Sequence, residues 1–145
     1  MNKVNIDKDI FNRIKKQVIN HYPYECCGIL IGKRDEAKIY EIIPAQNSAS
    51  KDALHKYYEI APLFLYRVEN EAESKGCEVL GFYHSHPDKK AIPSKEDEKH
   101  MIPGNIYMIV SVTDSVIYEF RAYYKKDPEE MSGETKINII KSGIK

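Results

Sequence analysis

The sequence lacks an excess of either charge. Its 145 residues include 22 Lys and Arg and 22 Asp and Glu, which gives a formal net charge of zero. Without a net positive charge, the chain has no general electrostatic attraction for nucleic acid. It also lacks a charged-then-apolar leader and any apolar run near the roughly 20 residues that span a bilayer. We therefore expect a cytoplasmic protein whose partners are neither nucleic acids nor membranes.

Cysteine is scarce as well. The three cysteines include the adjacent Cys26 and Cys27, and they form neither an even disulfide framework nor a Cys-x-x-Cys zinc pair. We expect reduced, buried thiols. Internal repeats, low-complexity tracts and an obvious domain boundary are missing too, and a chain of this length can form one domain with its own core.

Apolar periodicity divides the chain into helices and strands. Isoleucine and valine recur every four positions from Ile6 to Val18 and predict an amphipathic helix that ends at Pro23. A second helix is expected from Pro62 to a stop at Gly76. The other expected elements are strands over 25–32, 38–43, 57–60, 77–83, 106–111 and 116–123, a polar loop over 44–56 and a short helix over 94–101.

This order of elements predicts an α/β or α+β single domain, a mixed β-sheet with helices packed on it. We assign residues 1–125 to that domain and residues 126–145 to a C-terminal extension. The alternating segment Lys136-Ile137-Asn138-Ile139 in the extension fits either an edge strand or a loosely held tail.

Two histidines follow the apolar run 79–83 and are separated by one residue. Positions i and i+2 of a strand point to the same side, so His84 and His86 can face one point in space. Asp97 lies eleven positions after His86, where a helix is expected to open, and can supply a third ligand. Two histidines and one carboxylate form the protein ligand set of an open catalytic zinc site, in which water takes the fourth position.

Hydrolysis also requires a base and a group that stabilises the oxyanion. Ser94 lies one helical turn before Asp97, so its hydroxyl can reach the same pocket. Glu25 heads an apolar strand, and it can approach the metal-bound water as general base if that strand lies beside the one with His84.

Each of these residues also has a simpler interpretation. Ser94 and Asp97 match a helix capping box, in which both side chains only satisfy backbone N–H groups. The histidines could be a polar strand end, and Glu25 could be a solvated strand terminus. The catalytic interpretation depends on all of these features occurring together at this spacing.

The joint pattern of Glu25, His84-Ser85-His86-Pro87 and Ser94-x-x-Asp97 resembles the signature of the JAMM (MPN+) metalloproteases. The segment Pro23-Tyr24-Glu25-Cys26-Cys27-Gly28 is similar to the Pro-x-Glu-x-Cys-Gly start of the short prokaryotic members. The resemblance extends roughly from the first helix to Tyr123. It implies a cytidine-deaminase-like fold, Zn²⁺ held by His84, His86 and Asp97, Glu25 as base, and Ser94 supporting the tetrahedral intermediate.

The resemblance also implies a reaction. Members of this family hydrolyse isopeptide or peptide bonds after the C-terminal glycines of ubiquitin or ubiquitin-like proteins, and short prokaryotic relatives act on sulfur-carrier proteins or small ubiquitin-like modifiers. We therefore expect a zinc metallopeptidase whose partner is a ubiquitin-like or sulfur-carrier protein ending in Gly-Gly. Asp97 and the strand expected at Ile106 are only nine positions apart, so the long insertion of linkage-specific deubiquitinases is missing. The carrier, the leaving group and the oligomeric state stay open.

Two rival functions remain. Two histidines and a carboxylate also hold Fe(II) in oxygenases, although such sites need neither Glu25 nor Ser94. A non-catalytic interaction scaffold is the second rival, but relatives of that kind lack the ligands that this chain keeps. A deaminase is disfavoured because the His-x-Glu and Pro-Cys-x-x-Cys signature is absent.

Overall fold

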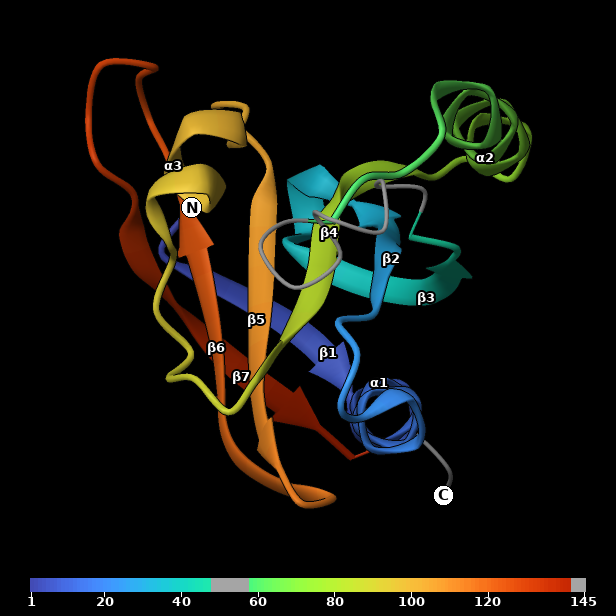
Figure 1. The fold of residues 1–145 in the computed structure, drawn as a ribbon. Coiled ribbons are helices and arrows are strands. Elements are labelled where there is room, and N and C mark those ends of the chain that lie inside the picture. Colours follow the sequence, from blue (N-terminus) through green and yellow to red (C-terminus); the bar gives the residue numbers. More distant parts are fainter. Residues whose placement is uncertain (48–57, 142–145) are drawn as a thin grey trace.

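The computed structural model describes residues 1–47 and 58–141 of the chain (Figure 1). Strands alternate with helical segments through about the first two thirds of the chain, and three strands then follow in succession. In chain order the elements are β1 (Lys3–Asp7), α1 (Lys8–His21), β2 (Cys27–Lys33), the 3₁₀ turn η1 (Arg34–Glu36), β3 (Lys38–Ala45), α2 (Pro62–Ser74), β4 (Glu78–Pro87), α3 (Lys95–His100), β5 (Ile106–Thr113), β6 (Val116–Tyr124) and β7 (Gly133–Ile140).

The strands form one mixed sheet that closes on itself in the order β1-β3-β2-β4-β5-β6-β7. The pairs β1–β3, β1–β7 and β4–β5 are parallel, and the other neighbours are antiparallel. The expected α/β single domain with a mixed sheet is confirmed. Residues 133–140 of the predicted extension are a strand with β6 on one side and β1 on the other, so this segment is neither of the two alternatives left open by the sequence, an edge strand or a loosely held tail.

Helices cover both faces of the sheet. On α1, Ile10, Ile14 and Val18 are buried in the main core together with Leu30 of β2. The neighbouring residue Ile29 faces the other way and packs in the cluster that includes α2. Because successive strand residues point to opposite faces, α1 and α2 lie on opposite sides of β2 (Figure 1).

The start of the first helix differs from the prediction. Ile6 belongs to β1, and α1 begins only at Lys8. Val4 and Ile6 are both fully buried, which is the alternation of a strand. Ile6 also happens to fit the four-residue spacing of the helix, and the partners of β1 come from distant parts of the chain, so local periodicity favoured the longer helix.

Four other predictions also needed correction. Residues 58–60 form no strand, and residue 57 lies outside the described residues. β3 continues to Ala45, inside the predicted loop, of which 48–56 are not described. β4 continues through both histidines to Pro87, and β2 starts at Cys27, so that Glu25 precedes it.

The predicted bounds of α2 are confirmed. Pro62 occupies the first helical turn, and Gly76 follows the C-cap with a φ of 75° that favours glycine. None of the helices in the described part of the chain combines the length and the apolar character needed to cross a membrane.

Candidate metal centre and active site

β4 brings the two histidines to one point. The Nε2 atoms of His84 and His86 lie 3.1 Å apart, because the two side chains leave the strand on the same side. Both rings are almost completely buried, with 1% and 4% of the residue surface exposed. The predicted convergence of the two imidazoles is therefore present in the structure.

α3 supplies the carboxylate. Asp97 Oδ1 lies 3.2 Å from His84 Nε2, and Asp97 Oδ2 lies 3.1 Å from His86 Nε2. Asp97 is 6% exposed. These three residues form a group of potential metal ligands whose donor atoms all lie within 4.8 Å of one another. The structure thus assembles the three predicted ligands from two elements that are separate in sequence.

The capping interpretation of Ser94 is also correct. The backbone N–H of Asp97 donates to Ser94 Oγ at 3.0 Å, and the backbone N–H of Ser94 donates to Asp97 Oδ2 at 2.8 Å. This reciprocal capping box opens α3 and fixes the Asp97 carboxylate. One pair of residues therefore begins the helix and places the carboxylate beside the histidines.

The charges of the ligands suit a divalent cation. Burial lowers the pKa of His84, so that its ring is neutral at pH 7. For Asp97, burial works toward a higher pKa, but the close contacts with the ring nitrogens of His84 and His86 and the hydrogen bond from the backbone N–H of Ser94 outweigh burial and hold the pKa well below its usual range. A neutral imidazole and an ionised carboxylate are the protonation states in which these side chains bind metals.

The tautomer of His86 provides a test of metal fit. Its Nδ1 lies 2.9 Å from the backbone carbonyl of Lys90, which can only accept, so Nδ1 carries the proton. In the form of the ring with a proton on Nδ1 alone, the lone pair of Nε2 faces Asp97 and His84. A cation among these atoms stabilises such a group of acceptors. The spacings of 3.1–3.2 Å are also close to the roughly 3.4 Å between ligands of a tetrahedral zinc ion.

Glu25 lies next to this group. β2 pairs with β4 so that Cys27 is opposite His84, which meets the condition set for Glu25 from the sequence. The backbone N–H of Cys26 donates to Ser85 Oγ at 2.9 Å, and the backbone N–H of Ser85 donates to the Cys26 carbonyl at 3.0 Å. This reciprocal pair fastens the residue after Glu25 to the residue between the histidines.

Glu25 is buried, with 7% of its surface exposed. Burial raises its pKa from 4.5 to about 7, while the charge of His86 opposes the rise and that of Asp97 adds to it. A carboxyl group with a pKa near neutrality can both accept and return a proton at physiological pH. Glu25 is therefore suited to acid–base chemistry, unlike a solvated strand terminus.

The adjacent cysteines are structural. Cys26 and Cys27 are buried and free, as expected. Burial raises the pKa of Cys26 to about 11 and that of Cys27 to about 12, so both remain thiols at neutral pH. Because the thiolate is the nucleophile and the metal ligand, neither side chain is suited to these roles, and neither belongs to the group of His84, His86 and Asp97.

Sequence reasoning missed three contributors. Tyr58 stacks on His84 with ring centroids 4.5 Å apart, Ser85 holds the segment after Glu25, and the Lys90 carbonyl fixes His86. A backbone carbonyl has no signature in a sequence, and no spacing connects Tyr58 to the histidines. Ser85 could have been noticed, because a polar residue between two ligands of a strand must point into the opposite face.

Comparisons with known proteins identify the family of the chain. The family model of prokaryotic homologues of the JAB domain matches residues 7–124. A desampylase from Haloferax volcanii is 36% identical over 90 residues, which span 61% of this chain and only 63% of that relative. A probable TtuB-protein conjugate cleaving protease from Thermus thermophilus is 27% identical over 127 residues, 88% of this chain and 79% of the relative.

Solved structures agree in fold. A Desulfitobacterium hafniense protein has a TM-score of 0.81 at 22% identity, with 96% of this chain and 94% of that protein covered. A JAB1/MPN domain protein from Archaeoglobus fulgidus has a TM-score of 0.60 at 19% identity, with 97% and 100% covered. At these identities the likeness concerns the fold alone. Together with the family match over most of the chain, the comparisons establish that this protein belongs to the prokaryotic homologues of the JAB domain, a short prokaryotic branch of the JAMM/MPN family.

Proposed function

We propose that this protein is a zinc-dependent isopeptidase or peptidase that hydrolyses the bond after the C-terminal Gly-Gly of a ubiquitin-like or sulfur-carrier protein. The observation that carries the proposal is the buried group of His84, His86 and Asp97 with Glu25, of raised pKa, beside it. The names of two relatives, a desampylase and a probable TtuB-protein conjugate cleaving protease, support the same class of substrate.

The burial of the site favours a narrow substrate. The three ligands and Glu25 are each at most 7% exposed, so a folded surface cannot reach them directly. The backbone of an extended C-terminal tail ending in glycine can come close to the buried group, because glycine has no side chain that would clash with the surrounding residues. This property supports a carrier-protein tail as the substrate.

In this proposal His84, His86 and Asp97 hold the zinc ion. When bound, zinc acts as a Lewis acid that polarises the scissile carbonyl and lowers the pKa of water. Glu25 accepts the proton of the attacking water on its carboxylate and then passes it to the leaving amine. A pKa of about 7 lets Glu25 perform both steps near neutral pH.

Ser94 has a second role in the proposal. Its Oγ already accepts from the N–H of Asp97, which uses one lone pair and leaves the hydroxyl proton able to donate. We assign that O–H to the oxyanion that forms on the scissile carbonyl. The capping bond holds the hydroxyl in place for this purpose.

The test uses zinc-loaded protein and candidate carriers from the same organism, each extended beyond Gly-Gly. Intact mass should show release of the extension and a carrier that ends in Gly-Gly. Lack of cleavage of every ubiquitin-like and sulfur-carrier protein of that organism would contradict the proposal.

Two variants separate the base from the ligands. Glu25→Ala should keep one zinc ion per chain and lose hydrolysis by about two to four orders of magnitude, because only the base is removed. Asp97→Ala should lose zinc and activity together. Elemental analysis of protein purified without chelator provides the metal content, and stoichiometric iron in place of zinc would favour the Fe(II) alternative.

A further inference from the structure

We propose that Ser111, Glu119 and Tyr123, on β5 and β6, are positioning residues for the metal ligand His86. They hold the backbone of residues 89–91 so that the Lys90 carbonyl stays against His86 Nδ1. The inference rests on the proposed function only for the identity of the bound metal, and its test uses no substrate.

The register of the sheet places these residues in one row with the ligand. His86 of β4 is paired with Ser111 of β5, and Ser111 is paired with Glu119 of β6. Paired residues on neighbouring strands point to the same face of a sheet. The side chains of His86, Ser111 and Glu119 therefore share one face, and the chain after β4 folds back across it.

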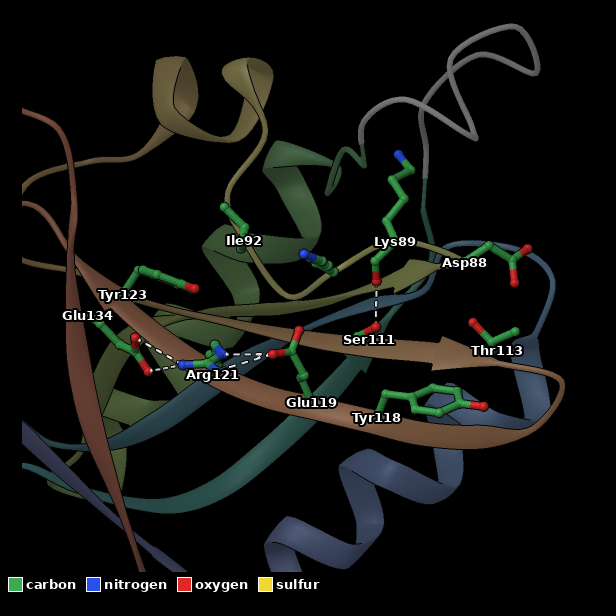
Figure 2. Close-up of a pocket in the computed structure, with 11 residues that line it drawn as sticks. Asp88, Lys89, Ile92, Ser111, Thr113, Tyr118, Glu119, Arg121, Tyr123 and Glu134 are labelled. Carbon is green, nitrogen blue, oxygen red and sulfur yellow. Dashed lines mark hydrogen bonds and ion pairs between the residues drawn. The ribbon is translucent and has the colours of Figure 1, made fainter.

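Three side-chain hydrogen bonds fasten this returning segment on both sides of Lys90. The Ser111 hydroxyl donates to the Lys89 carbonyl, as Figure 2 shows at the floor of a groove of about 600 Å³. The backbone N–H of Ala91 donates to Glu119 Oε1 at 3.0 Å, and the Tyr123 hydroxyl donates to the Ala91 carbonyl at 2.5 Å. The residue before Lys90 and the residue after it are thus both fixed.

Arg121 holds Glu119 in the required orientation. Its guanidinium donates to Glu119 Oε2 at 3.1 and 3.2 Å, which leaves Oε1 for the backbone of Ala91 (Figure 2). The other side of Arg121 pairs with Glu134 of β7. Glu134 makes the same kind of ion pair as Glu119 without a bond to residues 89–91 in the described structure, so it offers a matched control.

The Lys90 carbonyl decides which nitrogen of His86 binds metal. While Nδ1–H donates to that carbonyl, Nε2 has its lone pair free for the metal. If the carbonyl moves away, the ring can rotate or place its proton on Nε2, and either change blocks coordination. Loss of direct partners of ligand histidines weakens metal binding roughly 10- to 100-fold, and we expect about 3- to 10-fold from these more distant residues.

The experiment measures zinc affinity by chelator competition and the His86 tautomer by ¹⁵N NMR of the metal-free protein. Tyr123→Phe removes only a hydroxyl from a packed ring, and Glu119→Ala removes the acceptor for the Ala91 N–H. Each should weaken zinc binding about 3- to 10-fold and move the His86 signals away from the pure Nδ1–H tautomer. Glu119→Gln, which keeps an acceptor oxygen, should restore most of the affinity, and Glu134→Ala should change neither reading.

Wild-type zinc affinity together with a wild-type His86 tautomer in both Tyr123→Phe and Glu119→Ala would overturn the inference. Effects no larger than those of Glu134→Ala would overturn it as well, because they would reflect general stability. Failure of the wild-type protein to bind any divalent metal would refute the proposed function instead. The His86 tautomer in the metal-free variants would then still decide the positioning role.

Discussion

At the scale of single residues, the burial of Glu25 both costs stability and raises the pKa on which its proposed role depends. The folded protein keeps a carboxyl group buried at a position where burial raises its pKa to about 7. The unfolded chain ionises the same group near its ordinary pKa of 4.5. Ionised Glu25 therefore destabilises the metal-free fold, and this penalty is the physical basis of its readiness to take up a proton.

This penalty predicts how stability changes with pH. A group whose pKa is higher in the folded state stabilises the fold below the unfolded pKa, and that contribution is lost as the pH rises through the folded pKa. In metal-free protein, the stability of Glu25→Gln relative to the wild type should therefore increase by about 2–3 kcal/mol as the pH rises from 5 to 8. Urea unfolding at both pH values measures the difference.

Glu69, an exposed carboxylate on α2, provides the control for this experiment. Glu69→Gln should change stability by the same small amount at both pH values. If the advantage of Glu25→Gln did not grow with pH, the buried carboxyl group would not have the raised pKa on which its role as base depends.

At the scale of elements, the active site depends on how β2 is joined to β4. The hydrogen bonds between Cys26 and Ser85 fix the residue next to Glu25 against the strand that carries both histidines. Ser85 is fully buried and lies between two ligands, but its side chain serves the other face of β4. A single strand thus orients the proposed metal ligands on one side and the segment of the proposed base on the other.

Ser85→Ala should separate these two tasks. The variant leaves the buried N–H of Cys26 without its acceptor, which costs about 1–3 kcal/mol of stability, and it frees the segment that carries Glu25. We expect kcat to fall about tenfold while zinc content stays at the wild-type level. Steady-state kinetics on a cleavable carrier and elemental analysis measure the two quantities.

Ser74→Ala is the matched control, because the Ser74 hydroxyl makes an exposed bond to the Glu71 carbonyl at the end of α2. It should change kcat and zinc content little. Loss of zinc from Ser85→Ala would mean that Ser85 acts through the histidines, contrary to the role described for it.

Local signals explain which elements could be predicted from the sequence. Pro62 and Gly76 define α2 by backbone chemistry that needs no partner, and both were correct. The spacing of His84 and His86 guaranteed a shared side, and the Ser94-x-x-Asp97 spacing placed Asp97 in the first turn of α3. β1 was missed because its neighbours are β3 and β7, and residues 58–60 were mistaken for a strand because β-propensity depends on having such neighbours.

The same distinction holds for the candidate site. The three predicted metal ligands come together through periodicity and helix capping, which are local properties. The stacking of Tyr58 on His84 and the fastening of Lys90 by β5 and β6 arise only from the three-dimensional fold. Sequence reasoning therefore finds the groups that bind and react, and the structure adds the groups that orient them.

At the scale of the whole molecule, closure of the sheet depends on the pairing of β1 with β7. Five successive residue pairs join the two strands, and Ile6 is opposite Ile139. Ile6 is fully buried in the main core, whereas Ile139 is 46% exposed. The matched family region, residues 7–124, leaves out β7 and all but the last residue of β1.

These two isoleucines test the importance of the closing strands. Ile6→Ala should lower the free energy of unfolding by about 2–5 kcal/mol, because it opens a cavity in the core. Ile139→Ala removes the same atoms from a half-exposed position and should cost less than about 1 kcal/mol. Chemical denaturation of both variants provides the comparison, and equal losses would indicate that β1 is not part of the central core.

The pairing of β1 with β7 also has a consequence for how the chain acquires its structure during synthesis. Val4 is paired with Ile137, so β1 can complete this pairing only after more than a hundred further residues have been synthesised. Such distant contacts form late, because the entropy of closing the long loop is lost before the contact contributes any stability. β3 is made early and can pair with one edge of β1, but the edge that pairs with β7 stays open until residues 133–140 have been synthesised. A chaperone that shields exposed strand edges would therefore be needed longest at this edge of β1.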